Sequence, residues 1–194
     1  MAENITELDD HIGGLILMII FTICWTVLSE IFFNNSDHRI VGISFGIIIL
    51  YLIHSYLKFN KFNKSLPKKT IERNKKKDNW FYAVFALEGI AIFVGINILI
   101  NMGKGSLINC YMALIVGLHF IPLAKIFDRK FDYYIGFWTT LIALIGMILI
   151  HNNKFDYKIV NALICMGCAI STIAYGLKKI KDGNLFLIKI RKVK

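Results

Sequence analysis

Six long apolar segments constrain this chain more than any other feature, because each has about the length needed to cross a bilayer. They cover residues 12–33, 40–57, 80–102, 106–124, 133–150 and 159–177, close to the ~20 residues that a spanning helix requires. Hydrophobic residues make up 56% of the chain and charged residues 19%, and a soluble domain has no use for so much apolar surface. The sequence therefore predicts an all-α, polytopic transmembrane bundle of six helices.

The segments between the predicted spans are too short to fold as separate units. We expect a single transmembrane domain over residues 1–177, followed by a basic cytoplasmic tail over residues 178–194. The first ten residues carry four carboxylates and no Lys or Arg, which is the wrong sign for the start of a signal peptide. The first apolar segment is therefore expected to remain in the protein as a spanning helix.

Positive charge is distributed unequally between the two sides of the predicted bundle. The stretches Lys58–Lys77 and Lys178–Lys194 are rich in Lys and Arg, whereas the opposite side carries only Arg39, Lys104, Lys154 and Lys158. Short basic loops stay on the cytoplasmic side of a membrane. An even number of spans places both ends on one side, so we predict that both termini are cytoplasmic.

The net charge of +10 raises the question of a nucleic-acid partner. Basic loops beside spanning segments are already accounted for by topology, and each Lys or Arg near anionic lipid contributes ~1 kcal/mol of attraction. We therefore expect membrane lipids as partners, with anionic headgroups at Lys58–Lys77 and Lys178–Lys194, and no nucleic acid. A small-molecule ligand is possible, and the oligomeric state is left open.

Glu88 is the residue that most needs an explanation, since it lies about eight residues into the third apolar segment. A carboxylate at the centre of a span costs roughly 2.5–3.5 kcal/mol on insertion scales. Its helical face also carries Val84, Ala91 and Gly95, and small residues favour packing against other helices. Glu88 is therefore expected to face the interior of the bundle.

Counting residues from the basic side gives Glu88 a partner. His119 lies about eight residues from the cytoplasmic end of the fourth helix near Phe127. This helix runs in the opposite direction, so both groups are expected ~12 Å from the same interface. His54 lies on that side at a shallower depth, and Pro122 frees a backbone carbonyl beside His119. Glu88, His119 and His54 are our candidates for a site that binds a ligand or a proton.

Two readings of this cluster stay open. Buried pairs often fix how helices pack without doing chemistry, whereas intramembrane ionisable groups also mark ion, substrate or proton pathways. Glu30, in the first segment, lies near the outer end, where water can reach it. A further polar stripe on the last segment includes Asn161, Thr172 and Tyr175. This stripe fits either a hydrated lining or packing through small polar groups.

No catalytic residue, metal site or cofactor is predicted. The chain has no H-E-x-x-H zinc helix, no G-x-S-x-G elbow and no paired intramembrane aspartates. Cys165 and Cys168 form a C-x-x-C without a second pair or a nearby histidine, so a zinc site is not expected. Small packing residues are the preferred interpretation of these cysteines.

The segment from Gly117 to Phe127, GLHFIPLAKIF, resembles a segment of small, uncharacterised bacterial multi-pass membrane proteins with six helices. The resemblance implies an integral membrane protein of the bacterial plasma membrane and points to His119 and Pro122. It implies no activity and no catalytic assignment.

Three functions remain open. The polar intramembrane residues favour a small transporter-like or ligand-binding membrane module with its site around Glu88 and His119. The first alternative is a structural, sensory or accessory membrane protein that does not transport. The second is an intramembrane enzyme that modifies or hydrolyses lipids, with His119 as general base, although we lean against an enzyme because no nucleophile is apparent.

Overall fold

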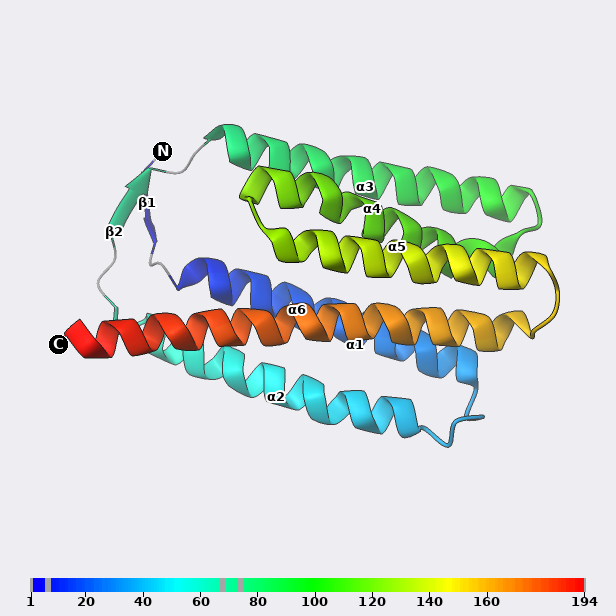
Figure 1. The fold of residues 1–194 in the computed structure, drawn as a ribbon, viewed down its shortest axis with the longest axis horizontal. Helices are drawn as coiled ribbons and strands as arrows, with labels where there is room; N and C mark the ends of the chain where they lie inside the picture. Colours follow the sequence, from blue (N-terminus) through cyan, green and yellow to red (C-terminus); the bar gives the residue numbers. More distant parts are fainter. Residues whose placement is uncertain (1, 6–7, 67–68, 73–74, 194) are drawn as a thin grey trace.

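Six long helices run side by side in this computed structural model (Figure 1), which describes residues 2–5, 8–66, 69–72 and 75–193. The elements are β1 (Ala2–Ile5), α1 (Asp9–Phe33), α2 (Ile40–Asn63), β2 (Lys69–Glu72), α3 (Lys75–Asn101), the 3-10 helix η1 (Gly105–Leu107), α4 (Ile108–Phe127), α5 (Lys130–His151) and α6 (Tyr157–Val193). The six α-helices are long and apolar enough to cross a membrane. The predicted six-span bundle is confirmed, and the chain is an integral membrane protein.

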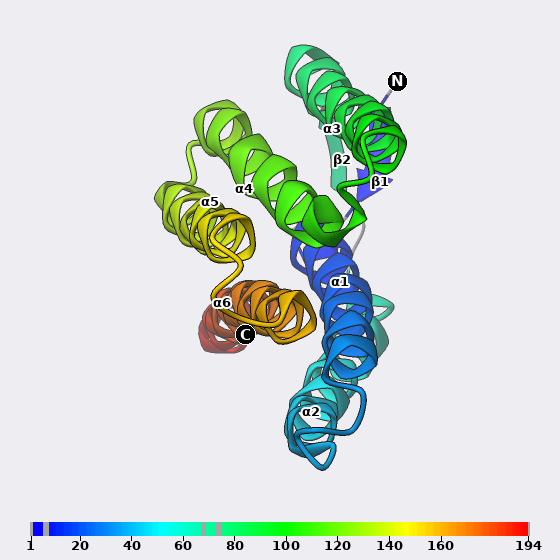
Figure 2. The ribbon, with the colours of Figure 1, turned by 90° about the vertical axis from the view of Figure 1, so that its right-hand side faces the viewer.

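The helices form a curved row rather than a closed ring. Seen from one end, α3, α4, α5 and α6 follow one another, and α1 and α2 lie beside α6 (Figure 2). The helix α6 packs against α1, α2, α4 and α5, whereas every substantial contact of α3 among the described residues is with α4 or η1. Accordingly, 72% of the apolar stretch of α6 is buried, compared with 11% in α2 and in α3.

The tightest crossing joins α4 to α5 at two glycines. A Cβ added to Gly117 would lie 2.6 Å from the backbone nitrogen of Thr140, and one added to Gly136 would lie 2.9 Å from the carbonyl oxygen of Gly117. Only glycine allows two helix backbones to approach this closely. The turn at Asp128 and Arg129 connects the two helices.

The helix α6 does not end at Leu177, where the predicted span ends, but continues to Val193. Ile180 and Leu187 are buried and belong to an apolar cluster with Leu8, Leu52 and Phe59 of the α1 and α2 region. The division of the chain into a domain and a tail at residue 177 stays a prediction, but the helix continues across that position and the residues beyond it contribute to the core.

Two short strands, which the sequence analysis did not predict, lie at the end of the bundle where α1 begins and α6 ends (Figure 1). They pair antiparallel, with Ala2 opposite Glu72 and Ile5 opposite Lys69. This ribbon ties the segment before α1 to the segment between α2 and α3. We call this end of the bundle the terminal end.

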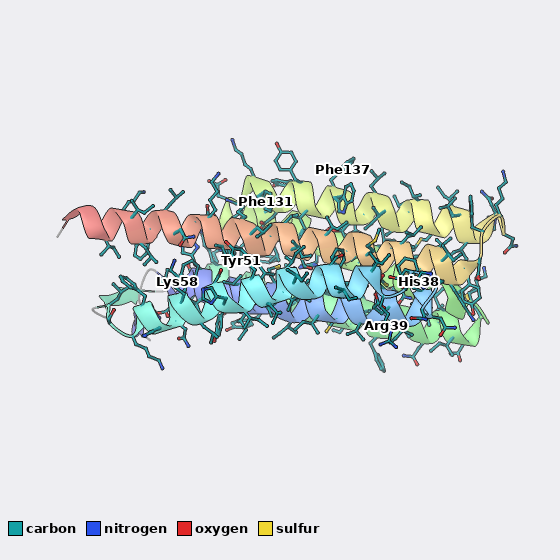
Figure 3. All side chains as sticks on the ribbon, turned by 90° about the horizontal axis from the view of Figure 1, so that it is seen from below. His38, Arg39, Tyr51, Lys58, Phe131 and Phe137 are labelled. Atoms are coloured by element: carbon teal, nitrogen blue, oxygen red, sulfur yellow. The ribbon has the colours of Figure 1, made fainter. Side chains whose placement is uncertain are left out.

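Large apolar side chains cover the outside of the bundle, as expected for helices surrounded by lipid. Phe93 and Phe137 are each 69% exposed, and Phe137 projects away from the neighbouring helices (Figure 3). Such a surface marks contact with a membrane or a partner. Lys58 lies towards the terminal end, with His38 and Arg39 at the opposite end (Figure 3). That the terminal end faces the cytoplasm stays a prediction.

Candidate functional site

The structure brings Glu88 of α3 and His119 of α4 into contact. His119 Nδ1 lies 3.2 Å from Glu88 Oε1, and each side chain is 10% exposed. The contact has the length of an ion pair, but His119 Nδ1 makes no hydrogen bond. The imidazole also packs edge to face on the ring of Phe85, with 5.8 Å between the ring centroids. The two groups predicted to share one depth are therefore neighbours in an apolar environment.

Among the described residues, α3 makes a substantial interface with one other long helix, α4, and the pair belongs to it. One turn or more away along α3, the ring of Tyr111 lies directly on Gly95, and its hydroxyl donates a hydrogen bond of 2.8 Å to the carbonyl oxygen of Ala91. Two arrangements thus hold α3 on α4: an aromatic clamp and an acid–base pair. The pair can hold a proton or fix the helix packing, and its role as a site stays a prediction.

His54 and Glu30 do not join this pair. His54 lies on the exposed side of α2, whose substantial contacts are with α1 and α6. Glu30 instead accepts a hydrogen bond of 2.6 Å from the backbone nitrogen of Gly42, at the start of α2. Its carboxylate therefore satisfies a free amide at a helix N-terminus, a position that favours negative charge.

Asp37 supports the same turn between α1 and α2. Its carboxylate accepts hydrogen bonds of 3.0 and 3.1 Å from the backbone nitrogens of Arg39 and Val41. Partial desolvation raises the pKa of Asp37, but these donors outweigh it and leave the pKa below its ordinary value.

Most of the polar stripe on α6 consists of contacts between helices. Thr172 Oγ1 lies 2.8 Å from Thr22 Oγ1 of α1, and the two hydroxyls also approach the carbonyl oxygens of Ala169 and Met18. The two hydroxyl groups have two protons to donate and three oxygen contacts to fill. Neither hydroxyl therefore has a proton free for a ligand. Asn161 is 1% exposed and donates hydrogen bonds of 2.9 Å to two backbone carbonyls. These groups pack the helices together.

Tyr175 differs from the rest of the stripe because it lines a cavity of about 990 Å³ at the terminal end. We call this the terminal cavity. It lies between the start of α1, the turn between α4 and α5, the start of α5 and residues 174–182 in the middle of α6. Its charged side chains comprise five cations and four carboxylates, together with His11: Arg129, Lys130, Lys178, Lys179, Lys181, Asp10, Asp128, Asp132 and Asp182.

The inner wall of the terminal cavity is formed by buried groups. Lys179 is 8% exposed and Asp132 is 2% exposed. The stem of Lys179 crosses Gly14 of α1, where an added Cβ would lie 2.7 Å from its Cε, and its ammonium lies 5.7 Å from the centroid of the Tyr175 ring. Arg129 Nη1 donates to the Tyr175 hydroxyl at 3.5 Å. Cations and a carboxylate thus surround one phenol.

Several of these groups lack a partner. Asp132 Oδ1 and His11 Nδ1 are buried and make no hydrogen bond, and in the described part of the chain no carboxylate oxygen lies within ion-pair distance of Lys179. Lys178, by contrast, forms an ion pair of 2.9 Å with Asp182. Buried polar groups are nearly always paired with protein, water or a ligand. Asp132 Oδ1, His11 Nδ1 and the Lys179 ammonium thus come together from three helices at the terminal cavity.

The sequence analysis missed the terminal cavity. Tyr175 and Lys179 are four residues apart and so share a helix face, which was the available signal. Because the spanning helix was expected to end at Leu177, Lys179 was placed in the tail and was not considered as a site residue. Asp132 lies one residue before the fifth predicted segment, residues 133–150, and was not singled out.

Among the described residues, no group of three or more His, Cys, Asp or Glu side chains is placed to hold a metal ion. Cys165 and Cys168 are buried free thiols in the core between α1, α4, α5 and α6. The interpretation of these cysteines as packing residues fits this position.

No family model, no curated protein and no solved structure matched the chain when it was compared with known proteins.

Proposed function

We propose that the protein is a small ligand-binding membrane module, transporter-like in character, whose ligand occupies the terminal cavity. The observation that carries this proposal is the convergence of Lys179 with two buried atoms that make no hydrogen bond, Asp132 Oδ1 and His11 Nδ1, on one space of about 990 Å³. Small-molecule sites are concave spaces of roughly 300–1,000 Å³ with a few polar groups aimed inward. A ligand with both donor and acceptor atoms would satisfy the carboxylate and the cations together.

The proposed ligand site differs from the one predicted from the sequence, which lay around Glu88 and His119. Neither of these residues lines the terminal cavity or the second cavity, of about 460 Å³, which lies beside Lys76 and Trp80. The acid–base pair is nevertheless connected to the terminal cavity by aromatic contacts. The rings of His119 and Phe120 have centroids 4.4 Å apart, and the rings of Phe120 and Tyr175 have centroids 6.0 Å apart.

The first experiment tests whether water and small solutes enter the terminal cavity. A cysteine placed at Ala174, in a Cys24→Ser background, is treated with a charged thiol reagent that reacts with thiolates. We expect modification at least tenfold faster than at Leu163→Cys, which lies on the lipid-facing side of the same helix and is 48% exposed in the native protein. Equal, slow modification at both positions would refute a hydrated site.

The second experiment tests binding. A panel of small polar compounds is added before the thiol reagent, and at least one is expected to slow modification of Ala174→Cys. The protection should disappear when Lys179→Met is combined with Ala174→Cys. If every compound leaves the rate unchanged, the terminal cavity is not a ligand site.

A proton-linked module is the second candidate, and the contact of 3.2 Å between His119 and Glu88 favours it. In this case the pair takes up and releases a proton while the ligand binds elsewhere. The test is proton movement into vesicles that contain the purified protein and a pH-sensitive dye. Unchanged proton movement in both Glu88→Gln and His119→Gln would eliminate this candidate.

A further inference from the structure

We infer that the ligand of the terminal cavity is a phosphate ester that also carries an amino or hydroxyl donor close to the phosphate. This inference rests on the proposed function, because it names the chemistry of the molecule that would occupy the terminal cavity. The groups that specify it lie on different elements: Lys179 on α6, Arg129 in the turn before α5, His11 on α1 and Asp132 on α5.

The cations of the inner wall fit the non-bridging oxygens of a phosphate ester. Lys179 supplies an ammonium that, among the described residues, has no carboxylate oxygen within ion-pair distance, and Arg129 keeps further N–H groups after its contact with Tyr175. His11 Nδ1 adds a third buried position without a partner. A phosphate monoester offers three non-bridging oxygens and a phosphodiester, as in a phospholipid, two, and Arg and Lys are the usual protein partners of both.

Asp132 specifies the second half of the ligand. Its Oδ1 atom is buried and unpaired, although cations line the same wall, so it is available to a donor that the ligand brings. An ammonium or a hydroxyl beside the phosphate would fill this role. A ligand that has only a phosphate would leave the Asp132 oxygen unsatisfied, at a cost in affinity.

The position of the terminal cavity makes it reachable both from lipid and from water. Leu177 and Tyr134 line it and are 43% and 72% exposed on the outer surface of the bundle. At the other rim, Lys181 and Asp128 are exposed charged groups. Amphipathic aromatic residues such as Tyr134 are typical of the level of the lipid headgroups. The same phosphate chemistry could thus arrive on a phospholipid or on a water-soluble ester.

The experiment measures binding to the full-length protein in detergent with paired probes. The lipid probes are short-chain phosphatidylethanolamine and phosphatidylcholine, which differ in that only the first has N–H donors. The soluble probe is ethanolamine phosphate, and diacylglycerol of the same chain length is the control without phosphate. We expect phosphatidylethanolamine, ethanolamine phosphate or both to bind, diacylglycerol not to bind, and phosphatidylcholine to bind roughly tenfold more weakly than phosphatidylethanolamine.

Substitutions of residues in the inner wall test whether the probes bind there. Lys179→Met keeps an apolar stem over Gly14 and should weaken binding of the phosphate probes tenfold or more, whereas Lys158→Met, at the exposed start of the same helix, should leave it unchanged. Asp132→Asn should reduce the preference for ethanolamine over choline. If Lys179→Met does not fold, as judged by gel filtration, Arg129→Gln takes its place.

The outcomes separate this inference from the proposed function. Binding of the lipid probe alone, or of the soluble probe alone, supports the inference and identifies the source of the phosphate. Equal binding in Lys179→Met and the native protein, or equal binding of phosphatidylethanolamine and diacylglycerol, overturns it. If a compound without phosphate protects Ala174→Cys while no phosphate probe binds, the inference fails and the proposed function stands. If Ala174→Cys is also inaccessible, both fail.

Discussion

Gly95 shows at the residue scale how α3 is attached to the bundle. The Tyr111 ring lies where a Cβ would be, so Gly95→Ala requires the ring or the helix to move. We expect a loss of about 1–3 kcal/mol in the free energy of unfolding, measured by chemical denaturation in detergent. Gly89→Ala is the matched control, because a Cβ at that position of α3 meets nothing within 4 Å. A similar effect of both substitutions would contradict this account of the clamp.

The contact between Glu88 and His119 predicts coupling between the two positions. Either Glu88→Leu or His119→Leu leaves one buried polar group without a partner, which costs about 1–3 kcal/mol. The double variant removes both groups, so its loss of stability should be smaller than the sum of the two single losses, by about 0.5–3 kcal/mol. The measurement is a double-mutant cycle on the free energy of unfolding. Additive effects would show that the two side chains do not interact.

At the element scale, the C-terminal half of α6 is expected to be part of the folded core. Deletion of residues 178–194 removes Ile180 and Leu187, which are 4% and 6% exposed, and burial of each such side chain contributes about 1.5–3 kcal/mol. The truncated protein should therefore lose several kcal/mol and unfold at lower temperature, whereas deletion of residues 190–194 should have little effect. Full stability of the longer deletion would identify the segment as an independent tail.

The elements that could be predicted from the sequence are those for which the length of an apolar run is sufficient to identify a spanning helix. Apolar runs of 18 or more residues have few alternatives to spanning helices, and all six were found. The continuation of α6 was missed because Lys178, Lys179 and Lys181 interrupt the apolar run. Ile180, Gly183 and Leu187 recur there at helical spacing, but burial of that face depends on Phe59 of α2, a contact between distant segments that no local pattern reveals.

At the scale of the whole molecule, the candidate site could be predicted only in part. Glu88 and His119 could be paired from the sequence because the depth of a residue in the membrane follows from its distance along the helix from the interface, and the two residues have the same depth on neighbouring antiparallel helices. Depth alone does not predict the terminal cavity, because His11, Asp132 and Lys179 are far apart in the sequence and lie on three different helices. They meet only because α6 packs against both α1 and α5.

The aromatic contacts through Phe120 and Tyr175 predict that the acid–base pair and the terminal cavity influence each other. In the Ala174→Cys background, Glu88→Gln is expected to change the rate of thiol modification about 2- to 30-fold, which corresponds to a coupling of about 0.5–2 kcal/mol. Phe120→Leu should abolish this effect. Asp156→Asn, at the opposite end of the bundle, serves as the control. An unchanged rate in Glu88→Gln would show that the two places act independently.

The dependence of α3 on α4 has a consequence for how the protein is made. The ribosome completes α3, with Glu88, before it has synthesised His119, which follows about 30 residues later. At ~5–20 residues per second this delay lasts roughly 2–6 s, during which the carboxyl group has no histidine to meet. Because the substantial contacts of α3 among the described residues are with α4 and η1, we expect α3 to reach its final packing only after α4 has entered the membrane.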